Sequence, residues 1–494
     1  MKPTSLFRGQ PSFDRDAFKR TALYSLAFLF AAHAFCFFNL TYSGNSVMLN
    51  VSKGYNEQIA CGHYLQPIYW QIRGSLSSPL FVGMLSALYL SLLNLVLVWL
   101  LELHRPLSLF ALCGATTANA AILSVCAASL HTADASFLAL LLAALACACC
   151  TRLRLGILPG SLLLTAALAL DAGSCAYFAA LALIVLLSDL ILTRHTKATA
   201  AGAVSCLLAL AAAIVLHQLG HMLMLRRSGI QSSTALSLFG GHPLSAYRAS
   251  VSAMLSPLTA YHHLSVVIRV LLAAFSLLLI VRSARTHGKT TALLLGIGAL
   301  ALPLFCSMTF LSAQAGLQIT SAHCLLDVLP IVLLSHLLPR HKAGNRLLFA
   351  AFSILFAGSI VFSNQVYLKK NLEFESTLSF MSRVVSRLEE MPGYFPGHTP
   401  VAVIGTPEES VFSSQRKGFE HLSVLDAARS NFAVSSDSDM IWYMWEVMGY
   451  PLNFVSTYEL EQLKLTEEAA SLPAFPQEGC CAFIGDTLVI RISE

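Results

Sequence analysis

The sequence predicts an all-α polytopic membrane protein with a small α/β domain at its C-terminal end. Of the 494 residues, 56% are hydrophobic and only 12% are charged, whereas about a quarter of an ordinary soluble protein is charged. The apolar residues gather in runs of about 18 or more, which is the length of a helix that spans a bilayer. The last 131 residues differ, because they hold 18 of the 26 Asp and Glu residues.

The apolar runs predict about eleven membrane spans. The first run is expected to stay in the protein as a helix, because no small-residue cleavage site of a signal peptide accompanies it. The expected spans cover residues 21–40, 78–101, 107–130, 135–150, 156–170, 174–193, 199–224, 263–281, 290–312, 323–338 and 346–363.

The distribution of basic residues predicts the topology. Sixteen Lys and Arg residues fall at the N-terminus and in the loops on its side of the membrane, and five fall in the loops on the other side. Cytoplasmic loops carry such an excess, so the N-terminus is expected in the cytoplasm, and eleven spans place the C-terminus outside. The net charge of +5 therefore reflects topology and gives no indication of nucleic-acid binding.

Two of the loops expected outside are long, at 41–77 and 225–262. Irregular backbone cannot face lipid without hydrogen-bond partners, so such loops must be solvated, folded onto the protein or interfacial. Long loops in compact proteins are usually functional or disordered. The first contains the stretch YSGNSVMLNVSKGYNEQIACGHYLQPIYWQIRG, whose Tyr and Trp residues favour a folded or interfacial loop.

The remainder, 365–494, has the pattern of an exterior α/β domain. QVYLKKNLEFESTLSFMSRVVSRLEE has apolar residues at helical spacing and ends before Pro392. VAVIG is expected to form a buried strand, SDMIWYMWEVMGY a helix and NFVS a second strand. CAFIGDTLVIRIS predicts a hairpin with Gly485-Asp486 at its turn.

Glu57 and Asp171 are the candidate catalytic carboxylates. Glu57 is the only acidic residue in either long loop, and a carboxylate there can take the proton from an attacking hydroxyl; it can equally be a solvated surface charge. Asp171 lies in a tight exterior turn between two expected spans. A carboxylate at that depth suggests a function, although a turn-capping Asp explains it as well.

Other polar residues allow both structural and functional interpretations. Asp134 is expected to cap the next helix, and Asp327 to face the bundle interior with a basic partner such as Arg269. The tract HQLGH, residues 217–221, resembles a zinc-protease motif but has Gln in place of the catalytic Glu, so two bundle-facing histidines and no metal are expected. A phosphate group could bind at Arg226, Arg227 or Arg248, or these side chains could extend to the interface.

Several stretches, in their order along the chain, resemble GtrII-type glucosyltransferases, polytopic membrane enzymes that add glucosyl groups to bacterial surface polysaccharide. The likeness runs nearly end to end. The stretches are YSGNS after the first span, GHYLQPIYWQIRG and SSPLFVGMLSALYLSLLNLVLVWLL at the second, the small-residue stretch TTANAAILSVCAASLHTADASF, and SNQVYLKKNLEFESTLSFMSRVVSRLEEMPGY followed by PVAVIG at the entry to the tail.

The resemblance implies a GT-C-like transmembrane domain over 1–364, in the bacterial inner membrane. It implies inverting transfer of a glucosyl-type sugar from a polyprenyl-phosphate donor to an O-antigen-like polysaccharide outside, without cofactor or metal. A carboxylate in the first exterior loop generally acts as base in such enzymes. Asn45 stands where the family tends to be acidic, and an amide cannot be a base, so that role goes to Glu57 or Asp171. The candidate substrate-binding residues are Asn45, His63, Tyr64, Trp70, Arg226, Arg227 and Arg248.

Two alternatives stay open. The chain could be a transporter or flippase for a polysaccharide precursor, which would favour interrupted helices and an inverted repeat. It could also be a catalytically impaired membrane scaffold whose exterior domain binds a partner.

Overall fold

A computed structural model gives the fold of most of the chain. The structure describes residues 14–42, 49–153, 155–193, 196–232, 247–248, 251, 263–307, 320–338, 342–407, 418–425 and 429–493. Asn45 and most of the second long loop lie outside the described residues.

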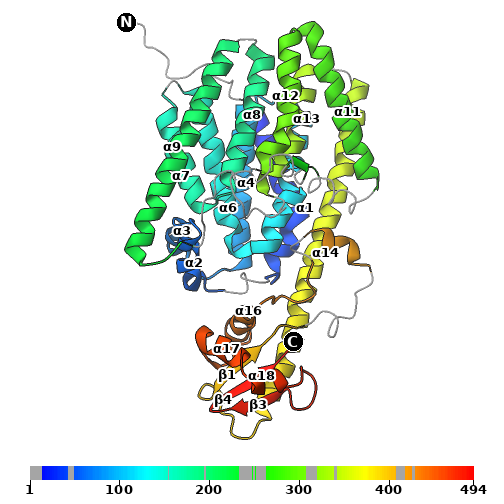
Figure 1. The fold of residues 1–494 in the computed structure, drawn as a ribbon. Helices are drawn as coiled ribbons and strands as arrows, with labels where there is room; N and C mark the ends of the chain where they lie inside the picture. Colours follow the sequence, from blue (N-terminus) through cyan, green and yellow to red (C-terminus); the bar gives the residue numbers. More distant parts are fainter. Residues whose placement is uncertain are drawn as a thin grey trace.

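The membrane part is a bundle of long apolar helices (Figure 1). Its helices are α1 (Arg15–Phe38), α4 (Pro79–Leu100), α5 (Pro106–Thr117), α6 (Ala120–Arg152), α7 (Ile157–Leu170), α8 (Ser174–Thr193), α9 (Thr196–Ser228), α11 (His263–Thr286), α12 (Lys289–Ser307), α13 (Leu325–Leu337) and the first half of α14 (Lys342–Glu389). The 3₁₀ helix η4 (Ser321–Cys324) leads into α13.

The bundle has the size and surface of a helical membrane protein. Eight described helical segments, with α5 and α6 counted as one, are long and apolar enough to cross a bilayer, and the segments Ile157–Leu170 and Ser321–Leu337 are apolar but shorter. The outer helices expose large apolar side chains, among them Leu223 at 66%, Leu271 at 62% and Leu300 at 68%. Such a surface is unfavourable in water and suits contact with lipid. The expected count of eleven spans stays a prediction.

The chain reverses direction within the stretch formed by α5 and α6. Arg152, at the end of α6, donates a hydrogen bond to the carbonyl of Leu100 at 2.8 Å, and Leu100 is only a few residues before the start of α5. Both ends of the stretch therefore lie at the same end of the bundle. Helical geometry is lost at Ala118-Asn119 and again at Ser129, where φ is −148° and ψ is 59°. The second break agrees with the expected boundary between the spans 107–130 and 135–150.

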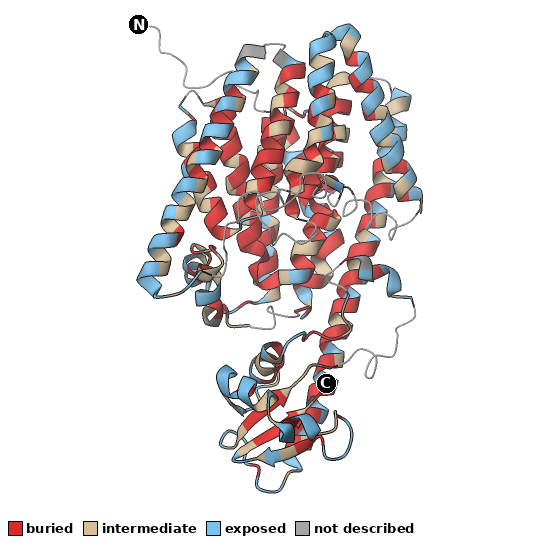
Figure 2. Ribbon diagram, in the orientation of Figure 1, coloured by how far each residue is buried: buried red, intermediate tan, exposed pale blue. Residues whose placement is uncertain are grey.

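The interior of the bundle is built around α6. Most of its residues are buried, and many are small (Ala, Cys, Ser), which lets neighbouring helices approach closely. Figure 2 shows buried residues along the inner faces of the helices and exposed residues on the outside. The predicted partnership of Asp327 is confirmed, since its carboxylate lies 3.2 Å from the guanidinium of Arg269.

The C-terminal domain is connected to the bundle by a continuous helix. α14 is 48 residues long and passes through the expected boundary at 364/365 without a break, because no Gly or Pro interrupts that part of the sequence. Its second half contributes Phe374, Phe380 and Met381 to the core of the domain.

The domain contains a four-stranded sheet in the order β2-β1-β4-β3, with β1 parallel to both neighbours and β3 antiparallel to β4. The strands predicted from sequence and the hairpin turn at Gly485 are confirmed. The elements are β1 (Pro400–Ile404), η5 (Glu420–Val424), α16 (Asp437–Trp442), the π-helical turn η7 (Tyr443–Val447), β2 (Asn453–Phe454), α17 (Thr457–Lys464), α18 (Glu467–Ser471), β3 (Cys481–Ile484) and β4 (Thr487–Arg491).

The first long loop and the C-terminal domain lie at the same end of the bundle (Figure 1). The loop forms the 3₁₀ helix η2 (Val51–Gly54) and the helices α2 (Tyr55–Ala60) and α3 (Gln66–Arg73). The N-terminal end of α1 and the connection between α4 and α5 lie at the other end.

Candidate functional site

The described part of the first long loop, residues 49–77, is folded, one of the two outcomes that its aromatic composition favoured. Its two ends meet, since the Val51 amide donates to the Ser75 carbonyl and the Ser77 amide to the Leu49 carbonyl, each at 2.9 Å. Tyr42 is buried and its hydroxyl donates to the carbonyl of Ser77 at 2.7 Å. These contacts close the loop at its base and leave η2, α2 and α3 to pack against the bundle.

An ion pair attaches the end of α3 to the middle of α6. The guanidinium Nη1 of Arg73 lies 2.9 Å from both carboxylate oxygens of Asp134, and the Tyr69 hydroxyl donates to the same carboxylate at 2.8 Å. The expectation that Asp134 caps a helix is wrong, because it is fully buried inside α6. The helix that contains Asp134 resumes after the break at Ser129, five residues earlier, and the start of α6 is capped by Asn119, whose side chain accepts from the Ala121 amide.

The same loop also contacts α7 and α9. The Leu65 amide donates to the Ala169 carbonyl at 3.0 Å. The two histidines of the HQLGH tract, which were expected to face the bundle interior, contact this loop. The Nε2 of His221 donates to the Ile59 carbonyl at 2.8 Å, and the ring of His217 stacks on Tyr64. Through these contacts the two histidines hold the loop against α9. No cluster of metal-ligating side chains occurs among the described residues.

A cavity of about 330 Å³ lies between the loop, α6 and the α7–α8 turn. It falls within the range of small-molecule sites, about 300–1,000 Å³. The loop side of the lining consists of Val51, Gly54, Glu57, Gln58, His63, Gln66 and Trp70. The bundle side consists of Ser124, Val125, Ala128, Ser129, His131, Thr132, Ser136 and Asp171.

Both candidate catalytic carboxylates line this cavity, although 114 residues separate them in sequence. Glu57 is exposed in the first turn of α2. Asp171 follows the last residue of α7 and its Oδ1 accepts the Gly173 amide at 2.7 Å, so the turn-capping contact exists. That hydrogen bond fixes the orientation of the carboxylate beside the cavity and leaves it able to accept further hydrogen bonds.

His63 lies between the two carboxylates in sequence and joins the loop to the α7–α8 turn. Its Nδ1 donates to the Gln58 side chain at 3.2 Å, and its Nε2 accepts from the Ala172 amide at 3.4 Å. This pattern requires a neutral ring. Burial lowers the pKa of His63 from its ordinary value, with the Asp171 charge opposing that shift.

Three polar side chains in the cavity wall have buried atoms without a hydrogen-bond partner among the described residues. These atoms are the Oε1 of Gln66, the Nε1 of Trp70 and the Nδ1 of His131. Buried polar atoms are normally paired, so each such atom calls for a partner. All three residues line the same cavity.

The remaining predicted site residues fall into three groups. Trp70 is 1% exposed and stacks on Tyr55 at the cavity wall. Tyr64 is buried in the packing between the loop and α9 and does not line the cavity. Arg226, Arg227 and Arg248 are exposed and also lie outside its lining, the first two in the last turn of α9.

Sequence reasoning missed the contribution of α6. Ser129, His131, Thr132 and Ser136 line the cavity, yet the sequence interpretation used only Asp134 from this stretch. The signal was present, because SLHTADASF is a polar interval in an otherwise apolar region. Gln66, one helical turn before Trp70, was missed in the same way.

The chain matches no protein-family model, no curated protein and no solved structure.

Proposed function

We propose that this chain is a membrane glycosyltransferase. It would move a glucosyl-type sugar from a polyprenyl-phosphate donor to an O-antigen-like surface polysaccharide, on the extracytoplasmic face of the bacterial inner membrane. One observation supports this function most: Glu57 and Asp171 line a single cavity with unpartnered sugar-compatible groups. The motifs that resemble GtrII-type enzymes suggest the same chemistry.

Sugar recognition is assigned to the cavity wall. The indole of Trp70 offers an N–H donor and Gln66 an amide acceptor, while His131 offers a ring nitrogen. Sugar hydroxyls act as both donor and acceptor, so they can satisfy all three. Because these side chains are held by packing, little side-chain entropy remains to be lost on binding.

The transfer step needs one base. An acceptor hydroxyl attacks C1 of the donor sugar, a new C1–oxygen bond forms, and the bond from C1 to the phosphate oxygen breaks. The polyprenyl phosphate leaves with the bonding electrons, and a carboxylate takes the hydroxyl proton. We assign that proton transfer to Glu57 first, because it is exposed at the cavity and can meet an incoming acceptor; Asp171 is the second candidate. One displacement inverts the anomeric centre.

The donor phosphate is assigned to Arg226 and Arg227. They lie one to two turns beyond His221, which contacts the loop, so they are at the same end of the bundle as the cavity. A guanidinium at the lipid headgroup level suits a phosphate. Arg248 stays a further candidate from the second long loop.

A transfer assay tests the proposal. Membranes that contain the full chain are given a labelled glucosyl polyprenyl phosphate and a surface-polysaccharide acceptor, and the label in polysaccharide is counted. Glu57→Gln and Asp171→Asn are compared with Asp486→Asn, which changes a carboxylate at the hairpin turn of the C-terminal domain. Loss of the base is expected to lower the rate by about 10²–10⁴-fold in one of the first two variants.

The control variant is expected to transfer at the parental rate. If Glu57→Gln and Asp171→Asn both keep the full rate, the site assignment is wrong. If the parent chain transfers no label with donor and acceptor both present, the proposed function is wrong.

A further inference from the structure

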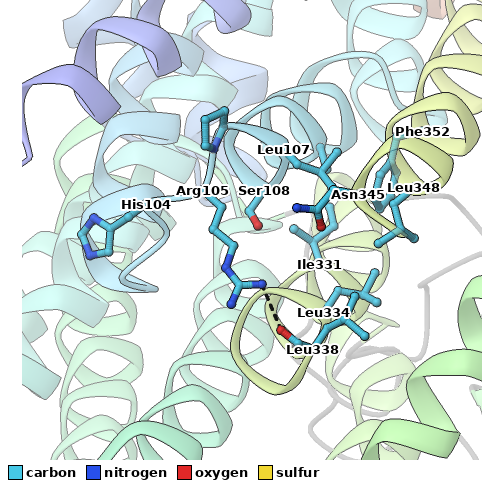
Figure 3. Close-up of a pocket in the computed structure, with 12 residues that line it drawn as sticks. His104, Arg105, Leu107, Ser108, Ile331, Leu334, Leu338, Asn345, Leu348 and Phe352 are labelled. Carbon is cyan, nitrogen blue, oxygen red and sulfur yellow. Dashed lines mark hydrogen bonds between the residues drawn. The ribbon is translucent and has the colours of Figure 1, made fainter. Parts of the chain in front are cut away.

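A second cavity, of about 440 Å³, lies between α5, α13 and α14. It is at the other end of the bundle from the first cavity, because α4 begins directly after the first long loop and ends near His104. Figure 3 shows the residues that line it. Neither the carboxylates nor the loop of the proposed active site takes part in it.

One wall of this cavity is apolar. Ile331 and Leu334 come from α13, Leu348 and Phe352 from α14, and Leu107 from the first turn of α5. An apolar wall of this kind suits an apolar ligand, and the bilayer supplies acyl chains.

The polar end of the cavity is formed by Arg105. Its side chain reaches from the start of α5 toward the end of α13, where Nη1 donates to the carbonyl of Leu338 at 3.1 Å (Figure 3). That contact satisfies a carbonyl at a helix C-terminus and holds the guanidinium in place. A guanidinium has five N–H groups, so it can bond a carbonyl and a phosphate together.

The surroundings of Arg105 add positive charge and access to lipid. Lys342 and Arg346 are exposed on the first turns of α14, and Asn345 between them lines the cavity. Next to these, Leu347 is 74% exposed and Phe349 51%. Apolar surface of this kind is where the hydrocarbon of a bilayer would lie, so this part of α14 is expected to lie next to lipid.

His104 is at the edge of the cavity and points away from Arg105 in Figure 3. Its Nδ1 lies 3.8 Å from the carboxylate of Asp14. Asp14 is not among the residues that line the cavity.

We propose that this cavity binds one anionic phospholipid of the bilayer. The phosphate contacts Arg105 and the Asn345 amide, and one acyl chain lies along the apolar wall of α13 and α14. A purely structural role for Arg105, as a cap of α13, explains its hydrogen bond to Leu338. It does not explain why an apolar cavity of this volume lies beside the guanidinium. The lipid lies between α5, which contacts both α13 and α14, and these two helices, and it would fix the start of α14.

Native mass spectrometry of the purified full chain tests this proposal. The protein is released from detergent after incubation with phosphatidylglycerol or, in a separate sample, phosphatidylcholine. The parent is expected to retain one phosphatidylglycerol with at least about tenfold preference, the size of a charge-assisted hydrogen bond. Arg105→Gln is expected to lose the preference. Arg285→Gln, which removes an exposed cation near the end of α11, is expected to keep it.

A second variant leaves the cation in place and fills the cavity. Leu348→Trp is expected to lower retention of phosphatidylglycerol by a similar factor, because the indole occupies the space of the acyl chain. Equal retention by the parent, Arg105→Gln and Leu348→Trp would overturn the proposal. Equal retention of both lipids by the parent would overturn it as well.

Discussion

The Nη1 atom of Arg73 lies 2.9 Å from the carboxylate of Asp134, and both side chains are almost completely buried, at 1% and 0% exposure. This ion pair connects the end of the first long loop to the middle of α6. The same guanidinium also donates to the His131 carbonyl and the Ser77 hydroxyl. The wall of the proposed active-site cavity therefore depends on a pair whose partners are 61 residues apart in sequence.

Asp134→Asn should destabilise the chain and release the loop. The amide leaves Arg73 as an uncompensated buried charge, and breaking a buried pair in this way costs about 3–5 kcal/mol. Thermal unfolding of purified protein, followed by tryptophan fluorescence, measures the loss. Limited proteolysis should cut the variant between residues 49 and 77 faster than the parent.

Asp327→Asn is the control for that experiment, because it breaks a second, partly buried pair, with Arg269, away from the loop. It should lower the unfolding temperature without faster cleavage in the loop. Cleavage that increases equally in both variants would show that the Arg73–Asp134 pair has no specific role in holding the loop.

Gly220→Ala should disturb the contact between α9 and the loop. A Cβ atom at Gly220 would lie 2.5 Å from the hydroxyl oxygen of Tyr64 and 2.9 Å from its ring. The aromatic ring cannot move without shifting the loop, so we expect a loss of about 1–3 kcal/mol, as for other overpacked sites.

Gly296→Ala is the control, since a Cβ there meets nothing within 4 Å. That variant should be neutral or slightly stabilised, because Ala favours a helix over Gly. Chemical denaturation of both variants gives the comparison. An unchanged midpoint in Gly220→Ala would contradict the packing of Tyr64 against α9.

His63 should make the stability of the chain depend on pH. Burial lowers its pKa in the folded chain, whereas an unfolded histidine titrates near about 6.5. Below that pH the unfolded chain binds the proton more readily. The contribution of His63 is therefore complete above about pH 6.5 and is lost as the pH falls toward the folded-state pKa.

His63→Gln removes that dependence, so its unfolding temperature should fall less than that of the parent between about pH 7.5 and 5.5. His398→Gln, at an exposed position in the C-terminal domain, should follow the parent curve. Parallel curves for the parent and His63→Gln would show that the ring is not buried in its neutral form.

The elements that the sequence predicted well depend on local patterns. The hairpin at Gly485-Asp486, the buried strand β1 and the turn at Asp171 each follow from a short run of residues. Asp327 and Arg269 could be paired because opposite charges inside a bilayer-spanning bundle have few alternatives. In each case either a short run of residues or a charge within an apolar segment identifies the residues that interact.

The cavity could be predicted only in part. Glu57 and Asp171 were singled out as rare carboxylates in segments expected outside the membrane, but nothing in the sequence shows that the loop folds back against α6. Asp134 was assigned to a helix cap because its partner, Arg73, is distant in sequence. Which polar side chains of α6 face the cavity depends on the break at Ser129, and no Gly or Pro marks that break.

The proposed function depends most on which side of the membrane the cavity faces. Labelling of single introduced cysteines in intact cells measures which side that is. A membrane-impermeant maleimide should label Glu57→Cys and Leu465→Cys, which is on the exposed surface of the C-terminal domain, above the background of the parent chain. Lys342→Cys, at the other end of the bundle, should be labelled only after the membrane is permeabilised. Labelling of Glu57→Cys only after permeabilisation would place the cavity in the cytoplasm and contradict the proposed transfer to surface polysaccharide.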